Sequence, residues 1–296
     1  MLKRLSLNKI SKMTLFILLL FLFCIYPKQT KYNLNTKVVS GNNYHDIFLI
    51  DDNNYVSKTT IAVNSIESNK LAQDLVKSLI IGSENSSKIP NNFKAIIPKG
   101  TKVQKININD KYLTISFDDN ILKTNNKDKM IECIVYTLTS IKNITNIKIL
   151  VNNKENSFFD KEYTRSIGIN KKYNLTSLED INNITIYYVS SNNDNNYYIP
   201  VTKYINTKDD KIKIIIEELS SSSSYQSNLM SYLNYDTKLI SYNLEDNELN
   251  LYFNDAIISK SDDKILEEVI YSISYSIKDS INVDNIHFYV NDKEFK

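Results

Sequence analysis

The sequence predicts an α+β protein with two tandem small domains behind an N-terminal membrane anchor. Each domain is expected to be a β-β-α-β-β-α-β sheet with helices packed on one face. Three observations support this fold class. The stretch FDDNILKTNNKDKMIECIVYTLTSI, which begins at Phe117, recurs from Phe253 as FNDAIISKSDDKILEEVIYSISYSI. In both copies the apolar residues follow a strand period and then a helix period. A basic flank and a short apolar run precede both copies.

Length and composition set the broad class of the chain. Its 296 residues leave room for two domains of ordinary size. Hydrophobic residues make up 42% of the chain and charged residues 24%, a balance that favours folded domains over disorder. Lys and Arg number 36 against 34 Asp and Glu, so the net charge is +2. That balance gives no support to nucleic-acid binding, and we expect no nucleic-acid partner.

Residues 1–30 are expected to form a signal or anchor segment. The apolar run MTLFILLLFLFCIY spans residues 13–26 and is nearer in length to a signal-peptide core than to a bilayer span. The bulky sequence FCIYPKQTKY offers no small-x-small cleavage site, which favours a retained signal-anchor. The basic flank should stay in the cytoplasm and leave the domains outside it. Its residues are Lys3, Arg4, Lys9 and Lys12.

Two alternatives for this segment stay open. Leu22 and Phe23 precede Cys24, which resembles a bacterial lipoprotein signal apart from the bulky Phe23, so lipid attachment at Cys24 is one alternative. Secretion after cleavage is the other. The second cysteine, Cys133, falls in an expected helix far from the first. A structural disulfide is therefore not expected, and two cysteines alone cannot form a zinc site.

Period-two alternation predicts a central strand in each copy. A further strand precedes each one, at residues 103–108 and 239–244, and the polar joins NDK and EDN favour hairpin turns. The inward side chains of the central strands are offset by 136 positions: Leu113, Ile115 and Phe117 in the first copy, and Leu249, Leu251 and Phe253 in the second.

A helix is expected after each central strand. Its N-cap is expected to be Asn126 in the first copy and Ser261 in the second. The two helices are aligned with an offset of 135 positions, because the loop before the helix is taken to be one residue shorter in the second copy. This alignment matches Ile134 with Val269. Residues at i, i+3, i+4 and i+7 form one apolar face in each helix. They are Ile131, Ile134, Val135 and Leu138, and Leu266, Val269, Ile270 and Ile273.

The remaining elements complete each copy. Closing strands enter the turns VNNKE and VNDKE, and the first halves align more weakly as two strands and a helix. The domains are expected at 44–156 and 183–296, with a linker at 157–182 that carries a short helix. The serines at 220–224 are expected in a flexible loop. The closing strands point inward with Ile147, Ile149 and Val151, and with Ile286, Phe288 and Val290.

These features together resemble the GerM domain, a family named from sporulation and spore germination proteins. They are a strand ending in Phe-Asp/Asn-Asp, a loop, a helix with Glu near its start and a strand closing on Val-Asn-x-Lys. Lys-Gly-Thr-Lys at 99–102 precedes them in the first copy. In the second copy NYDTKL replaces the Pro-x-Gly-Thr turn and keeps Thr237 and Lys238. The resemblance covers both expected domains.

The resemblance implies an extracytoplasmic or intermembrane protein of endospore-forming bacteria. Family members are usually membrane-tethered or lipoproteins, and their small α+β domains resemble the ring-building modules of secretion machines. In the best-understood setting they help to assemble or retain the channel complex between mother cell and forespore. No catalytic residue or cofactor belongs to the family pattern, so none is carried over to this chain.

Paired carboxylates are the main candidates for acid–base chemistry. The repeat argues against them, because Asp118 becomes Asn254 while Asp119 persists as Asp255. Glu132 is matched with Glu267, and both acids are expected in the first turns of their helices, where the helix dipole favours negative charge. Solvated charge therefore explains these groups better than catalysis. The pairs are Asp118 with Asp119, Glu217 with Glu218, Asp262 with Asp263, and Glu267 with Glu268.

The remaining reactive residues point to packing or to solvent. His287 stands where the first copy has Lys148, which favours exposure, and His45 has no visible partner. Cys133 is matched with Glu268 and is expected to be a packing residue. Tyrosines could form a sticky or glycan-stacking surface, although packing accounts for most of the 21 in the chain. The tyrosines considered are Tyr187, Tyr188, Tyr197, Tyr198, Tyr271 and Tyr275.

We therefore assign no catalytic, cofactor-binding or metal-binding residue and expect no enzyme. The expected role is structural, in sporulation or germination, through contacts with other envelope or sporulation proteins or with further copies in an oligomer or ring. The membrane contact is expected through the N-terminal helix. The alternative is a cell-envelope module that binds peptidoglycan through exposed Tyr and Asn, and a hydrolase ranks below both.

Overall fold

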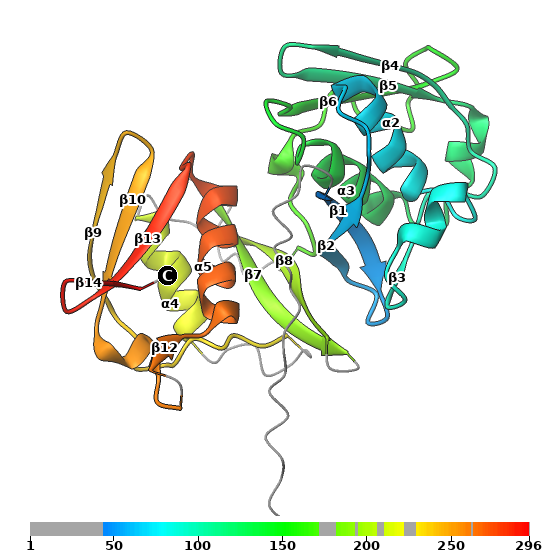
Figure 1. The fold of residues 1–296 in the computed structure, drawn as a ribbon. Coiled ribbons are helices and arrows are strands. Elements are labelled where there is room, and N and C mark those ends of the chain that lie inside the picture. Colours follow the sequence, from blue (N-terminus) through cyan, green and yellow to red (C-terminus); the bar gives the residue numbers. More distant parts are fainter. Residues whose placement is uncertain are drawn as a thin grey trace, which may run out of the picture. The chain divides into compact units, whose positions relative to one another are not determined.

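The computed structural model describes residues 44–171, 182–192, 195–205, 210–221, 229–261 and 263–295, and shows an α+β protein with two tandem repeats (Figure 1). The first repeat contains β1 (Tyr44–Asp51), β2 (Val56–Ala62), α2 (Ser68–Ser78), η1 (Glu84–Lys88), β3 (Phe93–Lys94), β4 (Val103–Asn109), β5 (Tyr112–Phe117), η2 (Asp119–Lys123), α3 (Lys127–Leu138) and β6 (Asn146–Val151). The second contains β7 (Asn182–Asn192), β8 (Asn195–Ile205), α4 (Lys211–Ser220), β9 (Leu239–Glu245), β10 (Glu248–Phe253), η4 (Asp255–Ile257), β11 (Ile258–Ser259), β12 (Lys264–Ile265), α5 (Glu267–Ser280), β13 (Asn285–Val290) and β14 (Lys293–Phe295).

The predicted anchor, residues 1–30, lies outside the described residues, as do residues 172–181 of the predicted linker. The described part of that linker carries one short helix, η3 (Arg165–Ile167). Within the six described ranges, no helix is both long and apolar enough to cross a membrane.

The main strands of each repeat divide between two sheets, and the short strands β11 and β12 of the second repeat form a further two-stranded sheet. In the first repeat β5 pairs antiparallel with β4 and parallel with β6, while β1 and β2 pair in a separate sheet. In the second repeat β10 pairs in the same way with β9 and β13, and β7 pairs with β8. The prediction of one small sheet covered on one face is therefore wrong, because the first hairpin of each repeat lies in a different sheet from the central strand of that repeat.

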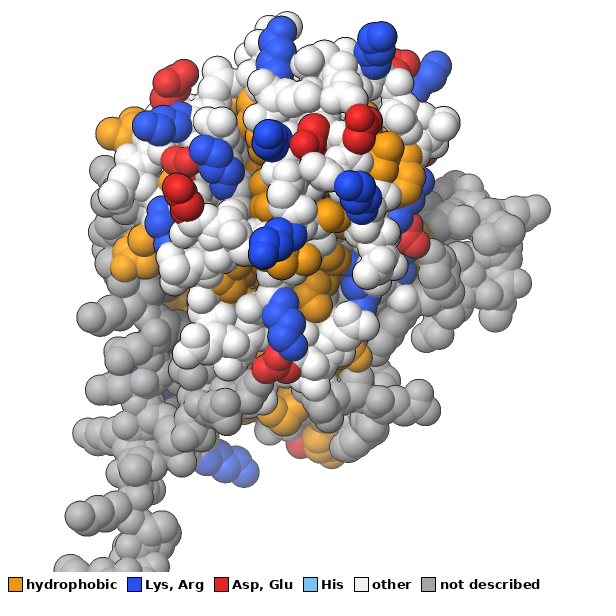
Figure 2. Space-filling view, turned by 90° about the vertical axis from the view of Figure 1, so that its right-hand side faces the viewer, with side chains coloured by type: hydrophobic (Ala, Val, Ile, Leu, Met, Phe, Trp, Pro, Cys, Tyr) orange, Lys and Arg blue, Asp and Glu red, His pale blue; other side chains and the backbone are white. Residues whose placement is uncertain are grey.

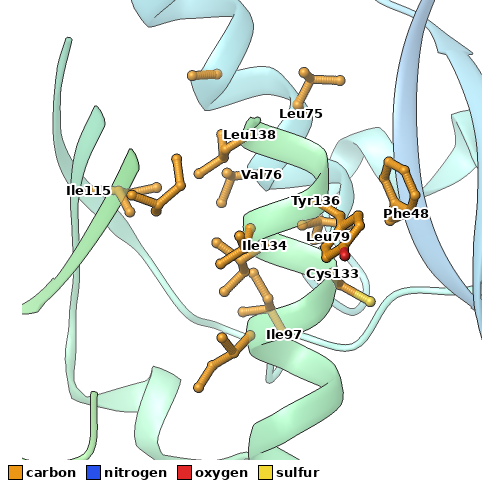
Figure 3. Close-up of a cluster of buried hydrophobic side chains, with 14 of the residues drawn as sticks. Phe48, Leu75, Val76, Leu79, Ile97, Ile115, Cys133, Ile134, Tyr136 and Leu138 are labelled. Carbon is orange, nitrogen blue, oxygen red and sulfur yellow. The ribbon is translucent and has the colours of Figure 1, made fainter. Parts of the chain in front are cut away.

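Helix α3 shows why a second sheet is needed. Every residue from 130 to 138 is buried. Figure 3 shows Ile115 of β5 on one side of α3 and Phe48 of β1 on the other, beside Tyr136. The rings of Phe48 and Tyr136 are 5.4 Å apart in an edge contact. A helix that is apolar around most of its circumference must be covered on both sides.

The predicted alternation in the central strands is confirmed. Their inward side chains are at most 1% exposed: Leu113, Ile115, Phe117, Leu249, Leu251 and Phe253.

The turns after β6 and β13 are two-residue hairpin connections. Both turn residues have positive φ, Asn152 and Asn153 in the first repeat and Asn291 and Asp292 in the second.

Hydrogen bonds to helix hydroxyls reveal how the two repeats correspond. Thr137 Oγ1 accepts the Phe48 N–H at 3.0 Å, and Ser276 Oγ accepts the Tyr187 N–H at 2.9 Å. Both the hydroxyl residues and the strand residues are 139 positions apart. The helices therefore align with an offset of 139, and the predicted offset of 135 is wrong.

The error amounts to one helical turn. Ile134 corresponds to Ile273 rather than to Val269, although all three side chains are at most 2% exposed. Apolar residues recur every three or four positions along a helix, so a slip of one turn leaves the same face apolar. The apolar pattern alone therefore identifies the buried face of each helix. It does not show which residue of α3 corresponds to which residue of α5.

The helix starts explain where the slip arose. Asn126 caps α3 as predicted, and its Oδ1 accepts the Lys129 N–H at 3.2 Å. Ser261 does not cap α5, which begins at Glu267 with Leu266 in the N-cap position. The small hairpin of β11 and β12 occupies the loop and moves the helix start along the chain.

The first-half hairpins of both repeats join into one five-stranded sheet in the order β3-β1-β2-β8-β7. A single residue pair, Lys58 with Tyr198, links β2 to β8 in the ladder. The described residues of the two repeats accordingly belong to one compact unit.

Candidate functional site

The segment between the repeats carries the contacts that complete this joined sheet. Asn170 has a φ of +44°, and its side chain reaches the backbone of both β2 and β8. Its Nδ2 donates to the Val56 carbonyl at 2.7 Å and to the Pro200 carbonyl at 2.8 Å, and its Oδ1 accepts the Val56 N–H at 2.9 Å. One side-chain amide therefore satisfies three backbone groups where the ladder itself is short.

The neighbours of Asn170 extend this contact. Ile169 N–H donates to Thr202 Oγ1 at 3.0 Å, and Thr202 N–H donates back to the Ile169 carbonyl at 2.9 Å. Glu132 Oε2 accepts the Asn170 N–H at 3.1 Å. Burial raises the pKa of Glu132, and the hydrogen bond from Asn170 opposes that rise. The Glu132 carboxyl thus takes part in the junction.

An ion pair closes the junction on the helix side. Arg165 pairs with Asp279, whose side chain is 8% exposed against 28% for Arg165. The Tyr187 hydroxyl donates to Asp279 Oδ2 at 3.0 Å. Arg165 Nε donates to Thr139 Oγ1 at 2.9 Å, and its guanidinium carbon lies 4.9 Å from the Tyr136 ring centre. These additional partners compensate the loss of hydration that burying two charges entails.

The ionisation states of this cluster follow from its burial. Burial raises the pKa of Tyr187 well above its ordinary value, and the Asp279 carboxylate raises it further. Burial by itself lowers the pKa of Arg165, but Asp279 and the neighbouring tyrosines outweigh it, so the pKa of Arg165 is raised. Tyr187 therefore remains a hydrogen-bond donor and Arg165 remains charged.

The motif residues of the two repeats hold a turn. Asp118 Oδ1 accepts the Lys102 N–H at 3.0 Å, and Asn254 Oδ1 accepts the Lys238 N–H at 2.9 Å. A carboxylate oxygen and an amide oxygen can both accept this bond, so Asp in one copy and Asn in the other are compatible with the same turn. The Thr-Lys and Asp/Asn motifs therefore contact each other for a structural reason.

The other predicted acids lie apart. By the helix register, Glu132 corresponds to Tyr271, so its predicted match with Glu267 is wrong. Glu268 is 8% exposed and accepts from Asn196 Nδ2 at 3.1 Å. Asp255 Oδ1 accepts a hydrogen bond from Asn291 Nδ2 at 2.7 Å, and Glu218 forms an ion pair with Lys203. Three further acids are exposed: Asp119, Glu217 and Asp263. Asp262 lies outside the described residues.

His287 lies between two carboxylates on the outer face of its sheet. Its Nδ1 is 2.8 Å from Glu294 and its Nε2 is 3.1 Å from Glu248. Hydrogen bonds to Glu294 and then Glu248 raise the pKa of His287. The corresponding place in the first repeat holds the ion pair of Lys148 with Glu155. The pairing is therefore a shared surface feature of the repeats.

The two other reactive side chains are shielded. Cys133 is fully buried and corresponds to the buried Ser272, so its predicted match with Glu268 is wrong while its packing role is confirmed. Burial raises the pKa of the Cys133 thiol well above its ordinary value. Burial also lowers the pKa of His45, whose Nε2 has no hydrogen-bond partner within the described residues.

The tyrosines considered for a binding surface lie mostly inside the protein. Tyr271 and Tyr275 are partly buried and stack 5.7 Å apart, with Lys58 Nζ 4.0 Å from the Tyr275 ring centre. The others are at most 7% exposed: Tyr187, Tyr188, Tyr197 and Tyr198. Packing therefore accounts for these four tyrosines, as the sequence favoured, and they do not form the glycan-stacking surface considered as an alternative.

The surface offers shallow hollows. One of about 270 Å³ lies beside Lys148 and Phe159, and one of about 290 Å³ lies between α2 and β4. In the described ranges no group of three His, Cys, Asp or Glu is placed to hold a metal ion. Figure 2 shows one face on which basic and acidic side chains stand singly around hydrophobic ones. The arrangement suits broad contact better than enclosure of a small ligand.

The junction residues Arg165, Asn170 and Asp279 were not indicated by the sequence. Arg165 and Asn170 belong to neither repeated stretch, and Asp279 reads as an ordinary charge near a helix end. Their contacts span more than 25 positions of the chain, and no local period signals such a pairing.

Comparison with known proteins gives a consistent result. Residues 46–157 and 185–296 match the family described as "Germane: Sporulation and spore germination". The spore germination protein GerM of Bacillus subtilis (strain 168) is 30% identical over 264 residues, which span 84% of this chain and 71% of that protein. The solved tandem GerMN domains of the sporulation protein GerM from Bacillus subtilis are 28% identical, with a TM-score of 0.74 over 84% of this chain and 91% of that one. Both relatives are named for sporulation or germination rather than for an enzymatic activity.

Proposed function

Because this chain belongs to the GerM family of sporulation and spore germination proteins, we propose that it is an assembly protein of that process that acts through protein–protein contacts outside the cytoplasm. The observation that carries the proposal is the junction. Two repeats are joined in one sheet and tied by Arg165, Asn170 and Asp279, and the hollows in their surface are shallow. Such a body suits the positioning of other proteins.

The N-terminal segment supplies the membrane contact in this proposal. Its basic flank and apolar run favour a chain with the N-terminus inside and both repeats outside. Protease added to protoplasts should then digest the repeats, and their protection would contradict the orientation. Replacing Cys24 with Ser should leave the protein in the membrane fraction if the segment is retained. Release into the medium would favour lipid attachment instead.

Deletion of the second repeat tests the assembly role. Spore yield and germination should fall severely even when the first repeat and the N-terminal segment remain. The first repeat must be shown to be folded in that strain, because the deletion uncovers β2 and removes Asp279, the ion-pair partner of Arg165.

Single acid substitutions provide the matched control. Asp119→Asn and Asp255→Asn change exposed carboxylates at corresponding places in the two repeats. Both variants should sporulate and germinate normally. A folded carboxylate variant with the full deletion phenotype would instead indicate catalysis and overturn the proposal.

A further inference from the structure

We propose that β4 of one copy of this chain pairs antiparallel with β9 of a second copy. The inference rests on the proposed assembly function and names a partner for it, another molecule of the same protein. Such a contact is heterologous, because it joins two different surfaces of the molecule.

Both strands are open edges of their sheets. Among the described residues β4 pairs with β5 alone, and β9 pairs with β10 alone (Figure 1). On β9, Leu244 is 42% exposed and the bulge residue Ile240 is 69% exposed. An exposed edge strand with apolar side chains is a ready template for another strand.

The register within each hairpin shows which backbone groups are free to pair. Asn109 and Tyr112 flank a two-residue turn and therefore form a hydrogen-bonded pair. Bonding alternates along the strand, so Ile106 and Ile108 direct their N–H and C=O groups to the open side. Glu245 and Glu248 likewise flank a two-residue turn and form a hydrogen-bonded pair. Tyr242 and Leu244 therefore direct their N–H and C=O groups to the open side of β9.

One register matches both faces of the two edges. Ile106 opposite Leu244 and Ile108 opposite Tyr242 bring together four side chains that lie on the core face, since each is paired in its own sheet with a buried Leu or Ile. The same register sets Lys105 opposite Glu245 on the outer face. Opposite charges at directly facing positions favour the pair.

Charge also separates this pairing from its alternatives. Residues 44–156 contain 15 Lys and 12 Asp or Glu, while residues 183–296 contain 10 Lys and 18 Asp or Glu. Joining β9 to β9 would bring two acidic repeats together, and joining β4 to β4 would leave Lys105 without an acid opposite. Joining β4 to β9 sets unlike repeats side by side.

The β-bulges and charged side chains that normally prevent an edge strand from pairing do not block the proposed register. Each strand has a bulge, but it lies near the first residues, between Val103 and Lys105 in β4 and beside Leu239 in β9. Lys105 is exposed and on the same face as Ser116, so its charge does not enter the core face that a partner would meet.

Disulfide trapping tests the register directly. Asn107 and Asn243 would face each other in a pair without backbone hydrogen bonds, where the Cβ atoms are closest, and both are exposed. The full-length chain in detergent, with Cys24→Ser, would carry Asn107→Cys in one preparation and Asn243→Cys in another. Mixing the two under mild oxidation should give a disulfide-linked dimer. Each variant alone should give none, and Asn250→Cys on the central strand β10 is the control that should link with neither.

A second measurement tests the charge match. Lys105→Glu should lower the association constant of the full-length chain about two- to five-fold, and Glu245→Lys on the partner chain should restore it. Sedimentation velocity of the mixed chains provides the readout.

The outcomes separate this inference from the proposed function. A disulfide dimer of Asn107→Cys with itself would show β4-to-β4 pairing and overturn the register. A chain that stays monomeric and forms no mixed disulfide would overturn self-pairing altogether. If deletion of the second repeat still abolished sporulation in that case, the assembly role would stand with a different protein as its partner.

Discussion

Arg165 and Asp279 are 114 positions apart in the sequence and form an ion pair that closes the junction between the two repeats. The pair shares its neighbours, Tyr136 from the first repeat and Tyr187 from the second, so it links side chains of both repeats. Together with the sheet that the two first hairpins share, this ion pair joins the repeats in one compact unit.

Removing one member of the buried pair should destabilise the protein. Asp279→Ala leaves the Arg165 guanidinium without its carboxylate and removes the acceptor of Tyr187, which should lower the free energy of unfolding by about 3 kcal/mol. Urea denaturation measures the change. Asp279→Asn keeps an acceptor for Tyr187 and should cost less than Asp279→Ala.

An exposed ion pair supplies the control for that experiment. Lys94 and Asp52 are 66% and 43% exposed, so Asp52→Ala should change the free energy of unfolding by at most about 1 kcal/mol. Equal effects of the two alanine substitutions would show that the junction pair contributes nothing beyond an ordinary surface contact.

Asn170 should tolerate no substitution that changes its hydrogen bonds. Asn170→Asp keeps the shape of the side chain but turns the Nδ2 donor into an oxygen that faces the carbonyls of Val56 and Pro200. We expect it to destabilise the protein by about 2–4 kcal/mol, since two buried carbonyls lose their donor. Denaturant unfolding measures the loss. Asn143→Asp, at another residue with positive φ, is the matched control and should have little effect.

Leu251 tests the central strand of the second repeat. Leu251→Asp places a charge on a fully buried side chain and should cost more than about 4 kcal/mol or prevent folding. Leu244→Asp on the edge strand β9, where the side chain is 42% exposed, should be tolerated much better. Circular dichroism with thermal unfolding distinguishes the two, and similar losses would contradict the difference in burial between the central strand and the edge strand.

His287 should make stability depend on pH. Glu294 and Glu248 raise the pKa of His287 above its ordinary value of 6.5, so folding favours the protonated ring. The stabilisation is fully present below 6.5 and is lost as the pH rises through the folded pKa. NMR titration of the ring protons should show the raised value. His287→Gln should remove this part of the pH dependence, and an unchanged pH profile would show that the contact is inconsequential.

Local patterns were sufficient for the elements and their faces. Alternation of apolar residues identified the central strands, and Leu113, Leu249 and their neighbours are buried as expected. The spacing of apolar residues identified the helices, and Asn126 was recognised as a cap because its side chain bonds within its own turn. These features depend on residues that are a few positions apart in the chain. They can therefore be recognised from the amino-acid sequence alone.

The correspondence of the helices needed the tertiary structure. Ile134 was matched with Val269 instead of Ile273 because both lie on the same apolar face one turn apart. The hydrogen bonds that Thr137 and Ser276 accept from β1 and β7 decide the register, and they join parts of the chain that are 89 positions apart.

By itself the sequence determined the repeat, the order of its strands and helices and the side chains that enter each core. The tertiary structure alone decided that the first hairpin and the central strand of each repeat lie in different sheets, that β2 meets β8, and that Asn170 and Arg165 hold the meeting point. The physical reason is the separation along the chain of the residues that interact. Strand and helix periods arise from neighbouring residues, whereas the junction satisfies buried backbone groups and charges by partners that only the folded chain brings together.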